Sequence, residues 1–397
     1  MAKLSIEDIG GEMKGRRVLM RVDFNVPLDE NRNITSEKRI KAALPSIKYV
    51  IEKGGKLVLM SHMGRPKGQK KPEFSLDVVA KKLSELIGKD VKFSTDCVGD
   101  EAKKTVESLK DGDVALLENV RFYKEETDND PEFSKKLASL GDIYVNDAFG
   151  SAHRAHASVE GVAKHIDKCA AGFLMNAELK FIGETMEHAE KPFVAILGGA
   201  KVSDKIKVID NLLTKVTDLV IGGGMAYTFI KAQGKDIGKS ICEDDKIQLA
   251  KEILKKAIDL NVPLYLPIDH IVAREFKADA EFKEVLRDSI EPGWQGLDIG
   301  PMTVKKFTNV IKDAKTIIWN GPMGVFEFDN FANGTLEIGK AIAESGAKSI
   351  VGGGDSVAAL KKLGLTDKMT HVSTGGGASL ELMEGKVLPG VAALTDK

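Results

Sequence analysis

Residues 193–209 read FVAILGGAKVSDKIKVI, and this stretch decides the expected fold. An apolar run comes first, as in a β-strand that is buried on both faces. Gly198 and Gly199 then form a turn, and a segment containing Lys201 and Lys205 follows as the start of a helix. A strand, a tight turn and a helix in this order begin a βαβ unit, so the stretch predicts a parallel sheet.

The same unit recurs along the whole chain. We predict strands at the short apolar runs 17–22, 56–60, 113–117, 142–145, 193–197, 218–221, 262–266, 316–319, 349–351 and 370–373. Residues 75–87, 246–260 and 333–345 place apolar side chains at helical spacing. The pattern predicts an α/β protein with two Rossmann-like, three-layer αβα domains, each built on a mostly parallel sheet.

Composition narrows the possible functions. The chain has 397 residues, enough for two domains, and its formal net charge is −1. No global field therefore favours nucleic acid or an anionic membrane, and we expect neither as a partner. Cys97, Cys169 and Cys242 form no CxxC pair, which disfavours a zinc cage or a disulfide framework. A signal-peptide core and a bilayer-spanning apolar stretch are both missing, which predicts a cytoplasmic protein.

The turns of the second half are rich in glycine. They contain Gly198-Gly199 and the triplets 222–224, 352–354 and 375–377. Such turns let backbone N–H groups approach an anion at the start of a helix. The chain has neither a GxxxxGK[ST] P-loop nor a GxGxxG spacing, which argues against both of those nucleotide folds.

Three charged residues stand beside these glycines. Lys201 and Lys205 are four apart, so in a helix they would share a face and could both address phosphates, or they could be two solvated lysines. Asp355 directly follows Gly354 and suits a magnesium ion on a polyphosphate, although a helix N-cap is the alternative.

The first half carries basic residues where the second carries glycine. Arg39, His62, Arg65, Arg121 and Arg154 stand near strand ends or early helix positions, and we call this set the basic cup. Arginine forks bind carboxylate or phosphate bidentately, so the set predicts a site for a small, highly charged acid. Asp23 and Asn25 would add an acceptor and an amide for the hydroxyl and phosphate oxygens of that acid.

At this point the sequence resembles the phosphoglycerate kinase family over nearly its full length. The matching motifs of the first half are RVDFNVP (21–27), SHMGRP (61–66), ENVRF (118–122) and DAFGSAHR (147–154). Those of the second half are residues 198–206, GGGMA (222–226), NGPMGVFE (320–327), 352–356 and 373–379. Ser151 stands where many relatives carry Thr.

The resemblance implies a role for each motif residue. It implies that 3-phosphoglycerate or its acyl phosphate is bound by Asp23, Phe24, Asn25, Arg39, His62, Met63, Gly64, Arg65, Arg121 and Arg154. It implies that the nucleotide is bound by Lys205, Gly222, Gly223, Gly296, Asn320, Glu327, Gly353, Gly354, Asp355 and Ser356. Glu327 would hold the ribose hydroxyls, Asp355 would ligate Mg²⁺, and Arg39, Lys201, Gly375 and Gly376 would surround the phosphoryl group in flight.

The chain also suggests where the domains divide, because a helix-like stretch ends before Lys191-Pro192 and the residue before proline resists helix. Residues 1–172 would form the 3-phosphoglycerate domain, 173–189 an interdomain helix and 190–389 the nucleotide domain, and the resemblance implies that the tail 390–397 packs back on the first domain. The implied reaction is reversible phosphoryl transfer between 1,3-bisphosphoglycerate and ADP, by direct in-line transfer after hinge closure. The family resemblance suggests a monomer whose partners are these small molecules.

Three rival classes stay open at the level of sequence. A different kinase of small carboxylates would keep the glycine turns but would not need this pattern of arginines. A non-catalytic derivative would have lost Arg39, Lys201 or Asp355, and all three are present. A nicotinamide-dependent dehydrogenase is disfavoured by the absent GxGxxG spacing.

Overall fold

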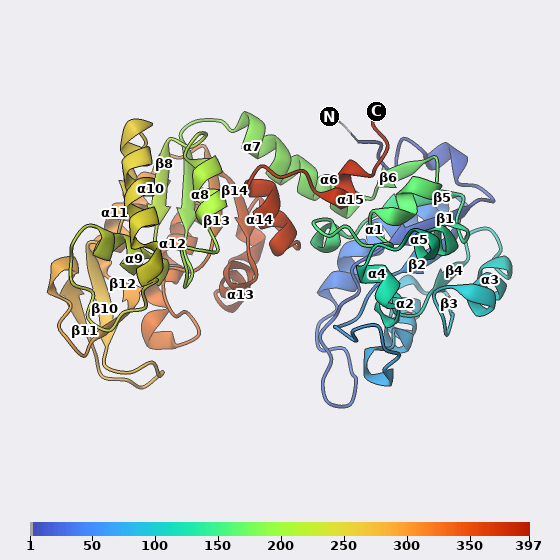
Figure 1. The fold of residues 1–397 in the computed structure, drawn as a ribbon, viewed down its shortest axis with the longest axis horizontal. Coiled ribbons are helices and arrows are strands. Elements are labelled where there is room, and N and C mark those ends of the chain that lie inside the picture. The colour runs from blue at the N-terminus through green and yellow to red at the C-terminus, as the bar shows by residue number, and fades with distance from the viewer. Residues whose placement is uncertain (1–2) are drawn as a thin grey trace. The chain divides into compact units, whose positions relative to one another are not determined.

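The computed structural model describes residues 3–397, which fall into two compact units. The first unit comprises residues 3–180 and Val387–Lys397, and the second comprises Phe181–Lys386. Both units alternate strands with helices along the chain (Figure 1). Within the described residues, no helix combines the length and the apolar character that a membrane span needs.

The first unit is built on a six-stranded sheet in the order β3-β4-β2-β1-β5-β6, in which every pairing is parallel. Its strands are β1 (Arg17–Arg21), β2 (Lys56–Met60), β3 (Val91–Phe93), β4 (Val114–Leu116), β5 (Ile143–Asn146) and β6 (Cys169–Ala171). Its helices are α1 (Lys38–Glu52), α2 (Asp77–Ile87), α3 (Gly99–Glu107), α4 (Lys124–Thr127), α5 (Pro131–Ala138), α6 (Phe173–Glu178) and α15 (Pro389–Ala392).

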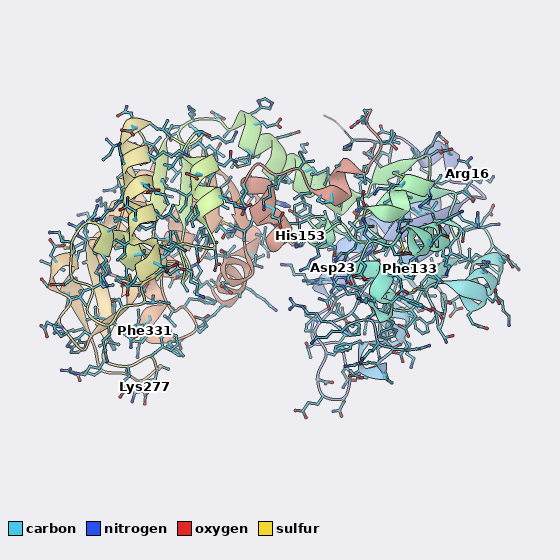
Figure 2. All side chains as sticks on the ribbon, in the orientation of Figure 1. Arg16, Asp23, Phe133, His153, Lys277 and Phe331 are labelled. Atoms are coloured by element: carbon cyan, nitrogen blue, oxygen red, sulfur yellow. The ribbon has the colours of Figure 1, made fainter. Side chains whose placement is uncertain are left out.

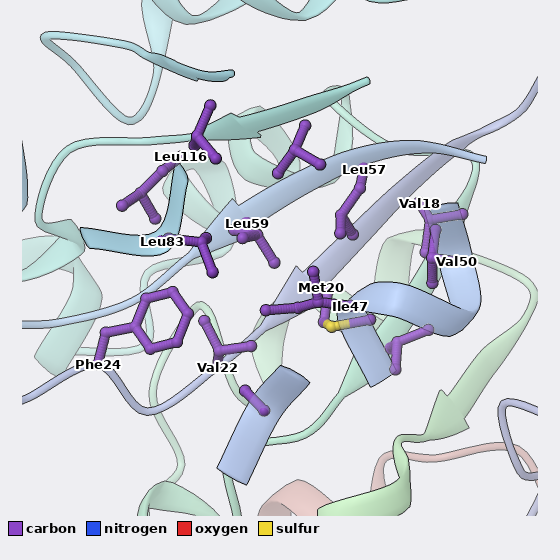
Figure 3. Close-up of a cluster of buried hydrophobic side chains, with 14 of the residues drawn as sticks. Val18, Met20, Val22, Phe24, Ile47, Val50, Leu57, Leu59, Leu83 and Leu116 are labelled. Carbon is purple, nitrogen blue, oxygen red and sulfur yellow. The ribbon is translucent and has the colours of Figure 1, made fainter. Parts of the chain in front are cut away.

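Burial of alternate strand residues against α1 and α2 makes the core of this unit. Figure 3 shows Met20 of β1 and Leu59 of β2 facing Ile47 of α1 and Leu83 of α2. All four side chains are fully buried. Phe24, just past the end of β1, extends the same cluster, so the loop that carries Asp23 and Asn25 is anchored in the core.

The second unit also contains a parallel six-stranded sheet, in the order β15-β14-β13-β7-β8-β9. Its strands are β7 (Phe193–Leu197), β8 (Asp218–Ile221), β9 (Leu264–Tyr265), β13 (Thr316–Asn320), β14 (Lys348–Gly352) and β15 (His371–Val372). Its helices are α7 (Glu184–His188), α8 (Ile206–Leu212), α9 (Met225–Ala232), α10 (Ile247–Asp259), α11 (Pro301–Lys312), α12 (Asn333–Glu344), α13 (Gly354–Lys362) and α14 (Gly377–Met383).

A smaller antiparallel sheet, which the sequence pattern did not reveal, completes the second unit. It consists of β10 (Asp269–Ala273), β11 (Phe282–Leu286) and β12 (Gln295–Ile299), with β10 in the centre. Phe331 and Ala273 lie in the apolar cluster of this region, and Phe331 and Lys277 are labelled at the same end of the unit in Figure 2. The predicted α/β class with two mostly parallel sheets is confirmed.

The stretch 173–188 is helical with one irregularity. Helix α6 is followed by a π-helical turn, Leu179–Gly183, and then by α7. The start of α6 is capped by a buried carboxylate, because Asp147 Oδ1 accepts from the N–H groups of Leu174 (2.9 Å) and Met175 (3.2 Å). The last residues return to the first unit, where Leu4 N–H donates to Thr395 O at 2.8 Å.

Candidate active site

The loops after β1 and β2 are tied together at the carboxyl ends of these two strands. Asn25 Oδ1 accepts from the N–H of Gly64 at 2.8 Å, and Ser61 Oγ accepts from the N–H of Phe24 at 2.9 Å. Asp23 Oδ2 accepts from Arg39 Nη1 at 2.5 Å. The structure thus brings the expected carboxylate, amide and arginine into one connected group at the ends of two neighbouring strands.

His62 lies behind this group, buried and held by a second arginine. Nη2 of Arg21 is 3.1 Å from His62 Nδ1. A guanidinium has only donors, so Nδ1 is the acceptor and the ring proton is on Nε2. Burial, together with the charges of Arg21, Arg121 and Arg39, holds the pKa of His62 well below its usual value, so the ring is neutral at pH 7.

Arg121 is the most constrained arginine of the basic cup. Its Nη1 donates to Gly64 O at 3.1 Å, its N–H donates to Asn119 Oδ1 at 3.0 Å, and its buried Nε has no partner within the described residues. Burial and the charges of Arg21 and Arg154 lower the pKa of Arg121 to about 10. The residue is still charged at pH 7. A bound anion would offset the neighbouring positive charges and accept a hydrogen bond from Nε.

Arg65 and Arg154 are the exposed members of the basic cup. Arg154 Nε lies 3.3 Å from His153 Nε2, and the charge of Arg154 helps to lower the pKa of Arg121. The Arg65 side chain makes no hydrogen bond or ion pair with any described residue. Arg154 is therefore close to the connected group, whereas no contact links Arg65 to it.

A buried network that no sequence pattern indicated adjoins His62. Arg21 Nε donates to Ser158 Oγ at 2.8 Å, and Ser158 donates in turn to Glu126 Oε1 at 2.7 Å. His156 Nδ1 lies 3.8 Å from the same Glu126 atom, and burial beside Arg121 lowers the pKa of His156 to about 4. The available signal was Arg21, a charged residue that directly follows the apolar run VLM of β1, and the structure shows that it is fully buried.

In the second unit, three glycine turns pack backbone against backbone. Gly199 N–H donates to Pro322 O at 3.0 Å, and Gly223 N–H donates to Met323 O at 3.1 Å. Gly223 has φ +65°, and a Cβ there would lie only 2.6 Å from the Gly199 nitrogen. Glycine is therefore required at position 223, because any side chain would push the β7 and β8 turns apart.

These turns form one wall of a pocket of about 380 Å³. The pocket is lined by Gly199, Ala200, Gly223, Gly224, Tyr227, Ile241, Pro267, Phe276, Gln295, Gly296, Leu297, Asp298, Ile299, Pro322, Met323, Gly324, Val325, Glu327 and Asp355. Most of these residues are apolar or glycine, while Glu327 and Asp355 bring exposed carboxylates. A mostly apolar cavity of this size with a few polar groups suits a flat heterocycle bearing a polar tail.

Several pocket residues could not be found from sequence. Tyr227, Phe276 and Asp298 belong to no glycine turn, and the last two come from the region of the antiparallel sheet. Burial raises the pKa of Asp298 to about 7, although the N–H groups of Ile299 and Gly334 donate to it. Gly296 was anticipated, and it also lines the pocket.

Lys205, which precedes α8, and Asn320, the last residue of β13, form a buried pair. Lys205 Nζ donates to Asn320 Oδ1, while Asn320 Nδ2 is buried without a partner in the described residues. Burial lowers the pKa of Lys205 to about 8, so the amine is still mostly protonated at pH 7. A phosphate oxygen would suit both the charge and the unpartnered amide.

The expectation that a helix begins at Lys201 is wrong. Helix α8 begins at Ile206, and Lys205 is the residue that precedes it. The segment 200–205 is a turn in which Lys201 is exposed and Lys205 is buried. Glu243 holds this turn by accepting from the N–H of Ser203 at 3.0 Å, so the two lysines do not share a helix face.

Asp355 lies in the first turn of α13 and is exposed to the pocket. Gly353, which precedes the helix, has φ +91°, and Ser356 Oγ accepts from the N–H of Gly321 at 2.6 Å. Residues 3–397 contain no group of three or more His, Cys, Asp or Glu side chains that could hold a metal ion. A single exposed carboxylate does fit Mg²⁺ that arrives on a polyphosphate, because this ion keeps several waters and phosphate ligands.

The turn after β15 offers backbone donors. Gly376 has φ +46° and precedes α14, and Gly375 N–H donates to Ser373 Oγ at 3.1 Å. Ser373 is in turn hydrogen-bonded to Ser379 on α14. The turn is therefore held in a defined shape next to the start of the helix.

Comparison with known proteins gives one consistent result. A family model described as phosphoglycerate kinase matches residues 6–386. The chain is 59% identical to the phosphoglycerate kinase of Clostridium botulinum (strain Hall) over 397 residues, covering 100% of this chain and 99% of that protein. A solved phosphoglycerate kinase from Coxiella burnetii has a TM-score of 0.92 at 43% identity, covering 99% of this chain and 98% of that one. One from Pyrococcus horikoshii has a TM-score of 0.83 at 36% identity, covering 98% of both chains.

Family membership sets aside a dehydrogenase and an unrelated carboxylate kinase. Phosphoglycerate kinases are phosphotransferases with a carboxyl group as acceptor, and they use ATP or ADP with Mg²⁺. The chain belongs to the phosphoglycerate kinase family, which catalyses reversible phosphoryl transfer between 1,3-bisphosphoglycerate and ADP in glycolysis.

Proposed function

We propose that the basic cup, with Asp23 and Asn25, binds 3-phosphoglycerate or its acyl phosphate. The observation that carries this assignment is the buried Arg121, whose Nε has no partner among residues 3–397 and whose charge is crowded by Arg21 and Arg154. An anionic substrate would accept a hydrogen bond from Nε and offset the crowding of positive charge. Neutral His62 would donate from Nε2 to a substrate oxygen, and Phe24, Met63 and Gly64 would shape the floor.

The pocket of the second unit would take the adenine nucleotide. Its apolar lining near Gly222, Gly223 and Gly296 suits the base, and Glu327 would accept from the ribose hydroxyls. Lys205 and Asn320 would bind phosphate oxygens, with the turn of Gly353, Gly354 and Ser356 beside them. Asp355 would hold Mg²⁺, which supplies charge neutralisation on the phosphates.

Phosphoryl transfer needs positioning and charge neutralisation more than covalent help from the protein. Arg39, Lys201 and the amides of Gly375 and Gly376 would surround the group in flight. Because the acid ligands and the nucleotide ligands belong to separate compact units, the two units would have to close for direct in-line transfer. The helical stretch 173–189 would serve as the hinge, between a substrate domain of residues 1–172 with the tail 390–397 and a nucleotide domain of 190–389.

We place the protein in the cytoplasm as a monomer that acts on these small molecules. The test of the proposed function is a coupled assay of ATP-dependent 3-phosphoglycerate use, with and without Mg²⁺. In parallel, 3-phosphoglycerate is titrated calorimetrically into the Arg121→Ala variant and into the unaltered protein, and the two affinities are compared. Turnover that persists without Mg²⁺, or unchanged acid binding in the variant, would contradict the assignment, and sedimentation equilibrium tests the monomer.

A further inference from the structure

Lys362, at the last position of α13, directs its ammonium group at a single segment. Its Nζ donates to the carbonyl oxygens of Phe326 (2.9 Å) and Glu327 (3.2 Å) and to Asp329 Oδ1 (2.7 Å). An ammonium has three donors, so all of them are used here. The side chain is 37% exposed and could have been hydrated instead, yet it is bound to residues 326–329.

An apolar contact joins the same helix to the same segment. Ala359 of α13 packs with Phe326 and Ala332 in a small buried cluster. Ala359 is three positions before Lys362 and so lies next to it on the helix surface. Helix α13 and the segment that carries Glu327 are therefore attached by both polar and apolar contacts.

The geometry of α13 links the two carboxylates of the pocket. Asp355 and Lys362 are seven residues apart, which is close to two turns, so they lie on one face of the helix about 10 Å apart along its axis. Asp355 lines the pocket from the start of α13, and Glu327 lines it from the segment that Lys362 holds. The helix thus sets the separation between a phosphate-end carboxylate and a sugar-end carboxylate.

We propose that Lys362 is a positioning residue that places the Glu327 carboxylate for the ribose hydroxyls of the nucleotide. This inference rests on the proposed ribose role of Glu327. The Glu327 side chain is exposed and makes no hydrogen bond or ion pair with the described residues, so its placement depends on its backbone. Lys362 binds the carbonyl oxygen of Glu327 itself, which is the most direct way to restrain that backbone.

The alternative is a purely structural role, in which Lys362 only stabilises α13, since a lysine in the last turn interacts favourably with the helix dipole. Lys361 provides the comparison. It lies in the same last turn and is exposed, but it makes none of these contacts with residues 326–329. A dipole effect would therefore be shared by both lysines, whereas positioning would belong to Lys362 alone.

The experiment measures dissociation constants of the full-length protein by calorimetry, using ADP and 2′,3′-dideoxy-ADP with Mg²⁺. Glu327→Gln is examined first, and it should weaken ADP but not the dideoxy nucleotide. If it weakens both equally or neither, the ribose role of Glu327 is wrong, and the inference about Lys362 is overturned with it.

Given that result, Lys362→Met should weaken ADP binding by about three- to tenfold, as expected for one lost hydrogen bond, and leave dideoxy-ADP within about twofold. Lys362→Arg should restore part of the loss, and Lys361→Met should change neither nucleotide. The double variant with Glu327→Gln should bind ADP no more weakly than Glu327→Gln alone. Equal losses for both nucleotides in Lys362→Met, or an additive double variant, would leave Lys362 a purely structural residue.

Discussion

Nη2 of Arg21 lies 3.1 Å from Nδ1 of His62, a member of the basic cup, and both side chains are buried. Because the guanidinium can only donate, the contact selects the neutral His62 tautomer that carries its proton on Nε2. The same arginine is joined through Ser158 to Glu126, whose carboxylate balances the buried charge. One residue thus connects the structural interior to the side chain proposed to meet the substrate.

We predict that His62 is in the neutral Nε2–H form at pH 7, since burial and the neighbouring arginines hold its pKa well below the usual value and Arg21 occupies Nδ1. Nitrogen-15 NMR of histidine-labelled protein reads the tautomer directly. In Arg21→Lys the pattern should become mixed and 3-phosphoglycerate should bind more weakly. A His62 signal from the Nδ1–H form in the unaltered protein would refute the assignment.

A second prediction concerns stability in acid. The pKa of His270 is lowered to about 4 by burial, and its ring lies 3.0 Å from the hydroxyl of Tyr227. A depressed histidine pKa gives stability that is present above the unfolded value near 6.5 and is lost as pH falls below it. Between pH 7 and pH 5 this residue should cost the folded protein about 2 kcal/mol. In urea denaturation, the stability gap between the unaltered protein and His270→Gln should shrink by about this amount.

Asp298 serves as the control of opposite sign. Its pKa is raised to about 7 by burial, so the folded state takes up a proton before the unfolded state does, and stability is gained as pH falls from 7 towards 4. Asp298→Asn removes that gain. The gap between the unaltered protein and Asp298→Asn should therefore widen in acid. Gaps that change in the same direction for both variants would show that these pKa shifts do not govern the pH dependence.

The third prediction concerns the metal. Asp355→Ala should strongly weaken productive use of the Mg²⁺ nucleotide and leave 3-phosphoglycerate binding nearly intact, because Asp355 and the basic cup lie in different units. Calorimetric titrations with each ligand make the comparison, with exposed Asp367→Ala of the same unit as the matched control. Equal losses at both sites would show that the assignment of separate sites is wrong.

The fourth prediction separates catalysis from binding at Lys201. This exposed side chain should matter most where negative charge shifts, so Lys201→Ala should lower kcat more than it raises either KM. Losing one electrostatic contact of this type costs about 10²–10³ in rate. A near-normal kcat with a raised nucleotide KM would show that Lys201 only binds the nucleotide in the ground state. The same comparison of kcat with KM in Arg39→Ala decides whether Arg39 acts in catalysis or only in binding.

The fifth prediction concerns motion. Each substrate alone would contact mainly one unit and offer little differential affinity for a closed state, whereas both together could shift the population. Solution X-ray scattering should therefore give a smaller radius of gyration with 3-phosphoglycerate and a magnesium–nucleotide analogue together than with either alone. An unchanged radius in all four ligation states, with both sites shown to be occupied, would contradict closure.

The sequence by itself determined the α/β architecture and the residue types of both candidate sites. Runs such as Phe193–Leu197 are apolar throughout because parallel strands are covered on both faces, and that is a local pattern any reader of the chain can see. Asp23, His62, Arg121 and the glycine turns follow such strands, and the rule that ligands bind at carboxyl ends of strands located them. The edge strands β3 and β6 were not predicted, because β3 (VKF) contains a lysine and β6 (CAA) contains no β-branched residue, so neither is an apolar β-branched run.

Only the tertiary structure decided how those residues are used. The Arg21–Ser158–Glu126 network joins positions more than one hundred residues apart, and no local pattern encodes such a contact. Lys201 and Lys205 have helical spacing, but the turn held by Glu243 exposes one lysine and buries the other. Spacing reports local geometry alone, whereas burial, tautomer and pKa depend on neighbours that the fold brings in from distant parts of the chain.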